Sequence, residues 1–194
     1  MYHEGNRKLQ QQFDSTALAD RLLEVTHHTT FNDYDRSLIE SASFFFLATA
    51  DHQGRPDCSF KGGSVKIVSE SRLMFPDYDG NGMFKSLGNI DVNPAVGLLF
   101  ITMGNSPQRI RVNGTARVLK DSPELKAFVG AQLLVEVNVE HIFPNCPRYV
   151  PDLSKGTESS YIPKAQQEPI EPEWKDMDWF KDVVPKRFDP DHSE

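Results

Sequence analysis

The spacing of hydrophobic and polar residues predicts several short β-strands within the first 145 residues. The strongest period of two lies in 109–119, where every second side chain is apolar and the others are mainly arginine, asparagine and threonine. An unbroken apolar run over 44–49 is typical of a central strand. The same reasoning predicts further strands over 57–62, 65–68, 72–76, 96–101 and 135–142.

Helical spacing is confined to short segments before and between these strands. Leu18, Leu22 and Val25 recur on one face of a helix that begins near residue 15, and 34–42 forms a second helix. Both are expected to pack on a sheet, while the first twelve residues are expected to be frayed. Further helices are predicted over 83–90 and 122–129. Many short strands with few helices predict a mainly β, α+β fold, a small antiparallel β-barrel with peripheral helices.

The chain of 194 residues is long enough for one domain with its own core. Residues 1–150 are expected to form this domain, with the N-terminal helices included. Residues 151–194 carry six lysines and arginines against eleven acidic residues and are rich in proline. Because Trp174 and Trp179 are too apolar to remain in water, we expect this acidic arm to dock on the barrel or on a partner subunit.

Composition and charge exclude several classes of function. The net charge of −7 argues against nucleic-acid binding, because nucleic-acid-binding proteins usually carry a basic surface. No apolar run approaches the roughly 20 residues that a membrane span needs. The N-terminus has no apolar secretory core, and two cysteines are too few for a disulfide framework or a metal cluster. We therefore expect a cytoplasmic protein with reduced thiols and no metal site.

The stretch 75–101 concentrates features that favour binding of an anion. Four residues that tolerate a positive φ, 79–82, predict a tight turn after a strand. A helix that opens after such a turn directs its unpaired N–H groups at one point, where Lys85 and Ser86 add a cation and a hydroxyl. The alternative is an ordinary strand–turn–helix connection without a ligand.

Two further segments present polar groups suited to a phosphorylated, planar ligand. Segment 59–63 offers a hydroxyl and an ammonium on one strand face, and segment 145–149 places an arginine beside a tyrosine. Each has a simpler explanation, with Lys61 as a solvated lysine and Cys146 as a small buried residue. No Gly-x-Ser-x-Gly, P-loop or Gly-x-Gly-x-x-Gly motif is present, so no protein nucleophile is predicted. Redox chemistry on a bound cofactor is compatible with this pattern.

Taken in order, five segments resemble the pyridoxamine 5′-phosphate oxidase-like flavoproteins, namely 44–50, 54–63, 75–100, 109–114 and 143–149. The resemblance covers roughly residues 35–150 and extends more weakly over 174–188. It implies a six-stranded antiparallel Greek-key split barrel of the FMN-binding type, which dimerises with FMN held at the subunit interface. The Arg-x-His motif that true pyridoxamine phosphate oxidases carry near the C-terminus is absent. The resemblance therefore implies FMN binding without implying oxidation of a vitamin B6 substrate.

By position, the resemblance also implies which residues bind FMN. They fall into four groups: residues of a strand, turn and helix that bind the phosphate; residues that border the isoalloxazine ring; residues on a strand that reaches the flavin from the partner subunit; and residues that close the site. In that order they are Ser59, Lys61 and Gly62 with Asn81, Gly82, Met83, Lys85 and Ser86; Phe75, Pro76 and Asp77; Arg109 and Arg111; and Cys146, Arg148 and Tyr149. From the residues alone, the two strand arginines are equally compatible with the solvent side of a sheet.

Together these inferences predict a homodimeric FMN-dependent oxidoreductase that transfers a hydride or electrons through flavin N5. The partner is a small organic substrate, with a nicotinamide or a deazaflavin as candidate donor. One alternative is a non-catalytic flavin or haem carrier or sensor on the same barrel, which would bind its ligand without turnover. Another is a barrel that serves only for protein interaction, in which Lys61→Ala and Lys85→Ala would leave all ligand affinity unchanged.

Overall fold

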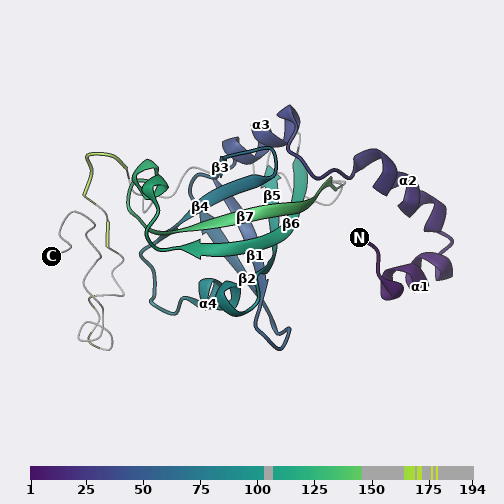
Figure 1. The fold of residues 1–194 in the computed structure, drawn as a ribbon, viewed down its shortest axis with the longest axis horizontal. Coiled ribbons are helices and arrows are strands. Elements are labelled where there is room, and N and C mark those ends of the chain that lie inside the picture. Colours follow the sequence, from purple (N-terminus) through teal and green to yellow (C-terminus); the bar gives the residue numbers. More distant parts are fainter. Residues whose placement is uncertain (103–106, 146–163, 169, 172–175, 177, 179–194) are drawn as a thin grey trace.

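The computed structural model describes residues 1–102, 107–145, 164–168, 170–171, 176 and 178. These residues form one curled antiparallel sheet with short helices around it (Figure 1). The predicted boundary at residue 150, and most of the predicted arm, fall outside the described residues. Within the described ranges, no helix combines the length and the apolar character needed to cross a membrane.

Within the described residues, seven strands pair in the order β2-β1-β5-β6-β7-β4-β3, and every pair is antiparallel. Strand β7 pairs with both β6 and β4 and so connects the two halves of the sheet. Six long strands match the expected barrel, and the seventh, β3, has only two residues. The strands are β1 Phe44–Ala50, β2 Pro56–Gly62, β3 Lys66–Ile67, β4 Arg72–Tyr78, β5 Ala95–Thr102, β6 Gln108–Leu119 and β7 Ala131–Pro144.

The sheet curls around a core of aromatic and branched aliphatic side chains. Phe45 packs edge-on against Phe75 and stacks with Phe100, with ring centroids 5.0 and 5.2 Å apart. All three side chains are buried. Strands β2 and β4, from opposite halves of the sheet, approach each other through side chains and not through strand pairing, with Lys61 Nζ 3.6 Å from Asp77 Oδ1. The barrel is therefore split along this line.

Strand β6 confirms the predicted alternation of buried and outward-facing residues. Ile110 and Val112 are buried in the core, whereas Arg117 is exposed. At Gly114 the register against β7 shifts, and a Cβ added there would lie 2.0 Å from the carbonyl oxygen of Asn138. This close backbone approach requires glycine at the bulge.

Helix α3, Asp33–Ser41, and a 3₁₀ helix cover two parts of the barrel. Helix α3 packs on the sheet as predicted and buries Leu38 and Ile39. The 3₁₀ helix η1, Pro123–Ala127, is shorter than the predicted helix. The residue after it, Phe128, packs with Met74, Ala131 and Leu134 to cover the outer side of β4 and β7.

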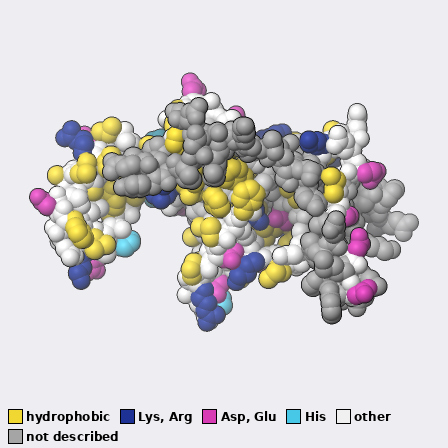
Figure 2. All heavy atoms as spheres, turned by 180° about the vertical axis from the view of Figure 1, so that it is seen from behind, with side chains coloured by type: hydrophobic (Ala, Val, Ile, Leu, Met, Phe, Trp, Pro, Cys, Tyr) yellow, Lys and Arg dark blue, Asp and Glu magenta, His cyan; other side chains and the backbone are white. Residues whose placement is uncertain are grey.

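Two further helices precede the barrel and form a hairpin that projects from it (Figure 1). The N-terminal residues expected to be frayed are instead helix α1, Glu4–Gln12, which a capping box closes. The expectation that the next helix, α2, Thr16–Thr26, packs on the sheet is wrong, because neither α1 nor α2 has a buried residue. They contact each other, for example through the Arg7–Asp20 ion pair at 2.7 Å. Hydrophobic side chains remain on the hairpin surface (Figure 2).

The hairpin joins the barrel through the residues that follow α2. The backbone of His28 forms a two-way bridge with Ile142 at the end of β7, with N–O distances of 3.0 and 2.8 Å. The ring nitrogens His27 Nε2 and His141 Nδ1 are 2.9 Å apart, and His28 Nε2 lies 2.6 Å from Asp35 Oδ2. The chain is thus fastened near the end of β7, directly after α2.

Candidate functional site

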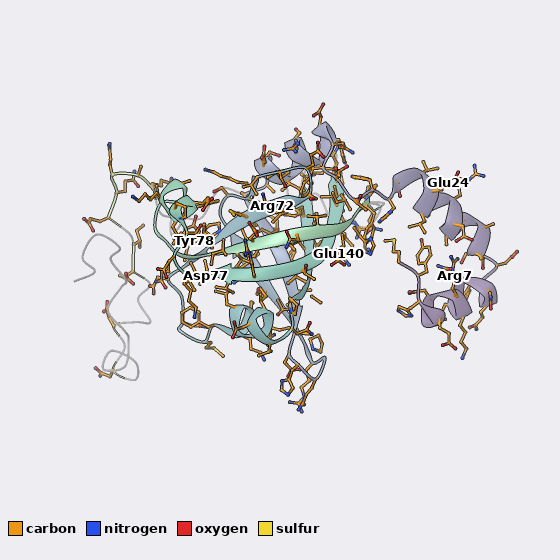
Figure 3. All side chains as sticks on the ribbon, in the orientation of Figure 1. Arg7, Glu24, Arg72, Asp77, Tyr78 and Glu140 are labelled. Atoms are coloured by element: carbon orange, nitrogen blue, oxygen red, sulfur yellow. The ribbon has the colours of Figure 1, made fainter. Side chains whose placement is uncertain are left out.

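A cleft of about 600 Å³ lies where β2, the end of β4 and helix α4, Lys85–Val92, meet. Figure 3 labels Asp77 and Tyr78, both of which line it at the end of β4. Its volume lies in the range of small-molecule binding sites. Of the residues assigned through the resemblance, those lining the cleft are Ser59, Lys61, Asp77, Asn81, Gly82, Met83, Lys85 and Ser86.

The turn before α4 keeps the backbone out of helical geometry until Lys85. Gly82 and Phe84 have positive φ angles of 72° and 46°, and Asn81 Oδ1 accepts a hydrogen bond from the Met83 N–H at 3.0 Å. The apolar spacing predicts a helix that begins at Met83, but the helix begins at Lys85. Phe84 occupies the N-cap position and supplies no side-chain cap. The first turn of α4 thus brings N–H groups without a side-chain cap to the cleft, which favours a negative charge there.

Helix α4 is fixed by polar and apolar contacts on its inner face. Ser86 is buried, and its Oγ lies 3.0 Å from the Oγ of Ser59 on β2. Asn89, also buried, donates a hydrogen bond from Nδ2 to Thr49 Oγ1 on β1 at 3.0 Å. Because Leu87 is buried as well, the start of the helix is held against β1 and β2. The cleft wall is therefore positioned by strands of the barrel.

The Lys61–Asp77 pair crosses the split between β2 and β4. The side chains of Lys61 and Asp77 are 20% and 14% exposed, and Nζ lies 3.6 Å from Oδ1. Burial raises the pKa of the Asp77 carboxyl above its usual range, and the nearby Lys61 ammonium partly offsets that shift. The cleft thus contains a lysine and a carboxylate that are largely desolvated and form a long ion pair.

Three other predicted residues adjoin the cleft without lining it. Gly62 ends β2 and pairs with Phe44. Phe75 is 1% exposed and belongs to the barrel core, and Pro76 is buried beside it on β4. The side chain of Phe75 therefore supports the barrel from within.

Arg109 and Arg111 lie on β6, away from the cleft of their own chain. The register of the sheet places Arg111 in a row with residues of four other strands on the outer face of the barrel. We call these residues the outer row: Phe60, Phe46, Leu99, Arg111 and Phe143. Phe60 is 61% exposed and stacks with Phe44 at 5.1 Å, and the Arg111 guanidinium lies 5.9 Å from the Phe143 ring. This row joins exposed aromatic surface to a cation.

The remaining predicted residues, Cys146, Arg148 and Tyr149, lie outside the described residues. The cleft also has lining residues that sequence reasoning did not single out. Most are neighbours of predicted ones, but Gln132 comes from β7 and donates to Asp79 Oδ1 at 3.3 Å. No local signal identifies Gln132, because it reaches the cleft through long-range pairing of β7 with β4. The lining residues that were not assigned to a ligand are Asp57, Cys58, Tyr78, Asp79, Gly80, Phe84, Leu87 and Gln132, of which Asp79 and Gly80 were predicted only as part of the turn.

Among the residues that the structure describes, no three histidine, cysteine or acidic side chains gather as metal ligands. The features present define a small split β-barrel with a ligand cleft at the start of a short helix. A sequence model of the pyridoxamine 5′-phosphate oxidase family matches residues 31–148, which is more than half of the chain. The chain belongs to this family.

Solved structures agree with this assignment at the level of the fold. HupZ of Group A Streptococcus is 18% identical, with 66% of this chain and 98% of that chain covered and a TM-score of 0.50. A putative pyridoxamine 5′-phosphate oxidase of Lactobacillus delbrueckii is 21% identical, with 61% and 99% covered and a TM-score of 0.50. At such identities the likeness shows the fold alone. No curated protein matches the sequence.

Proposed function

We propose that the protein is an FMN-dependent oxidoreductase that exchanges a hydride or electrons with a small organic substrate. The observation that carries this proposal is the cleft at the start of α4, where two serines, two lysines and a helix N-terminus without a side-chain cap lie together. Helix N-termini and lysines are favourable partners for phosphate groups, and a phosphate carries most of its charge at pH 7. Membership of the family supports the same ligand.

The donor set fits FMN in charge and in size. Lys61, Lys85, Ser59 and Ser86 would hold the phosphate together with the first N–H groups of α4. The remainder of the cleft, about 600 Å³ in total, is large enough for a drug-sized ligand. When bound, FMN supplies the redox chemistry at N5. The protein itself binds FMN, orients it and excludes water from it.

We extend the proposal to a homodimer with the flavin at the subunit interface. Its support is the outer row, which exposes Phe60 and places Arg111 beside Phe143 on the same face. An aromatic surface of this kind is favourable when a partner covers it. A second copy of the chain would cover it and bring Arg109 and Arg111 toward the neighbouring cleft, as the resemblance implies.

The cofactor proposal is tested by binding. The purified protein is expected to show flavin absorbance or to bind added FMN. Lys61→Ala and Lys85→Ala should each weaken FMN binding by about ten- to a hundredfold, because a charge-assisted hydrogen bond contributes about 1.5–3 kcal/mol. Lys66→Ala is the matched control, since Lys66 lies outside the cleft with its Nζ 3.4 Å from the Ala127 carbonyl oxygen. Absence of FMN binding by the wild type would reject the proposal.

The dimer proposal is tested by sedimentation. Phe60→Glu places a charge at the most exposed aromatic side chain of the outer row, on edge strand β2, and should convert a dimer into monomers that keep their fold. Val68→Glu is the control, because Val68 is 42% exposed and lies just beyond β3, away from the outer row. A wild-type protein that sediments as a monomer at micromolar concentration would contradict the dimer and leave the FMN site in place.

Steady-state turnover distinguishes the enzyme from a carrier. The FMN-loaded protein is incubated in air-saturated buffer with NADH, NADPH or a reduced deazaflavin, with O₂ as the electron acceptor that reoxidises the flavin, and donor oxidation is followed by absorbance. An oxidoreductase oxidises at least one donor in many turnovers. A protein that binds FMN and oxidises none of them is a flavin carrier or sensor on the same barrel.

A further inference from the structure

Lys61 in the cleft has two candidate partners for its ammonium group: the carboxylate of Asp77 and the phosphate of the proposed ligand. In the structure Lys61 Nζ lies 3.6 Å from Asp77 Oδ1, and both side chains are mostly buried. The proposed function assigns the same ammonium to the FMN phosphate. The lysine stem is flexible and its ammonium is a point charge, so it can turn from one partner to the other within the cleft. A phosphate is the stronger attractor, because it carries a larger charge than a carboxylate.

The position of Asp77 makes its basicity depend on whether the Lys61 ammonium is near. Its carboxyl lies on β4 at the bulge where β4 meets β7, with 14% of the side chain exposed. Lys61, Asp57 and Cys58 line the cleft from β2, Tyr78 from the end of β4, Asp79 from the turn and Lys85 from α4, while β7 contributes the neutral Gln132. Lys61 is the cation that offsets the effect of burial on Asp77. A buried carboxylate whose cation departs becomes a stronger base.

We propose that Asp77 is a positioning residue that holds Lys61 across the split in the free protein and takes up a proton when Lys61 turns to the phosphate of the ligand. This inference rests on the proposed function and deepens it. It makes FMN binding a proton-linked event at one named carboxyl. It also assigns Asp77 a role different from bordering the flavin ring.

The sign of the linkage follows from the two states of Asp77. In the free protein, burial raises the pKa of Asp77 and Lys61 restrains that rise. Once Lys61 is engaged by phosphate the restraint is gone, so the pKa of Asp77 rises further. Between these two pKa values, binding takes up a proton, and FMN affinity increases as the pH falls by up to about tenfold per pH unit. Ionisation of the phosphate itself acts in the opposite direction near pH 6 and must be subtracted.

The test compares the wild type with Asp77→Asn, which keeps the shape and removes the charge. FMN binding is measured by calorimetry in two buffers of different ionisation enthalpy, from about pH 5.5 to 8. The wild type should take up more protons than Asp77→Asn, by a difference that approaches one. At the upper end of this range Asp77→Asn should bind FMN more tightly than the wild type, because Lys61 no longer has a competing partner. A purely structural role for Asp77 would weaken binding instead.

Two controls isolate the linkage. Asp79→Asn changes a carboxylate of the same cleft that contacts Gln132, and it should keep the proton number of the wild type. If Asp77→Asn does not fold, carboxyl NMR of the wild type measures the pKa of Asp77 directly, which should be higher with FMN than without it.

Equal proton numbers in the wild type and Asp77→Asn, with FMN bound to both, overturn this inference alone, as does a pKa of Asp77 that FMN leaves unchanged. Absence of FMN binding by the wild type overturns the proposed function, and this inference with it.

Discussion

Helices α4 and α2 differ strongly in how much of their surface is buried: the shorter helix, α4, packs firmly on the barrel, whereas the longer helix, α2, does not. Helix α4 has eight residues, including a glycine, yet it buries Ser86, Leu87, Asn89 and Ile90. Helix α2 has eleven residues with a leucine-rich face, yet it buries none. The difference lies in what each chain segment is attached to. Helix α4 returns directly to the barrel through β5, whereas α2 is held at the tip of β7 and leads away from it.

This contrast indicates which part of the molecule has a fixed geometry. The start of α4 is held to β1 and β2 by the Asn89–Thr49 and Ser86–Ser59 contacts, so a ligand at the cleft meets a preorganised wall. The hairpin leaves apolar side chains such as Leu18 exposed. Substitutions in the two helices should therefore have very different effects.

The largest expected difference is in stability. Ile90→Ala, in the buried face of α4, should lower the free energy of unfolding by about 2–5 kcal/mol, because it leaves a cavity under the helix. Leu22→Ala, in α2, should change it by no more than about 0.5 kcal/mol, because Leu22 is 49% exposed. Urea unfolding monitored by circular dichroism measures both. Comparable losses for the two variants would show that the hairpin is as firmly packed as α4.

A smaller effect of opposite sign is expected within α4 itself. Gly88 is exposed, and a Cβ built there meets nothing within 4 Å. Gly88→Ala should therefore raise the free energy of unfolding by about 0.5–1 kcal/mol through helix propensity. The same urea titration checks it, and FMN affinity should be unchanged because Gly88 does not line the cleft. Destabilisation by Gly88→Ala would mean that α4 requires flexibility at this position.

The smallest effect concerns pH and the attachment of the hairpin. Burial, then His141, His28 and the N-terminal ammonium lower the pKa of His27 below its ordinary value of 6.5. A detached hairpin therefore binds more protons than an attached one. The attachment is complete above about pH 6.5 and weakens as the pH falls through the lower pKa of the folded state. The protection factors of residues 1–26, which correct for the intrinsic pH dependence of amide exchange, should fall over that range, and His27→Phe should remove this change. Equal protection factors at all pH values in the wild type would contradict it.

The sequence was sufficient for the strands and for the alternation of faces along β2. The alternation of 57–62 places Ser59 and Lys61 on one face and Phe60 on the other, and both faces are found as predicted. Periodicity identifies such faces because it is a local property of a strand. The start of α4 was misplaced by two residues, because the positive φ of Phe84 is set by the turn and leaves no apolar signature.

Long-range features were beyond the reach of local patterns. Gln132 enters the cleft because β7 pairs with β4, and the hairpin joins the barrel through the bridge between His28 and Ile142. The apolar spacing of α2 predicts a helix with a face to bury, and it says nothing about where a partner for that face lies. Pairing partners far apart in sequence are decided by the whole chain, so these contacts required the structure.

The central claim is that the start of α4 and its neighbouring lysines grip a phosphate. Parallel fluorescence titrations with FMN and with riboflavin, which differ only in the phosphate, test it most directly. The account predicts that FMN binds at least about a hundredfold more tightly than riboflavin, since several charge-assisted contacts depend on the phosphate. Equal affinity for the two flavins, or binding of neither, would contradict it.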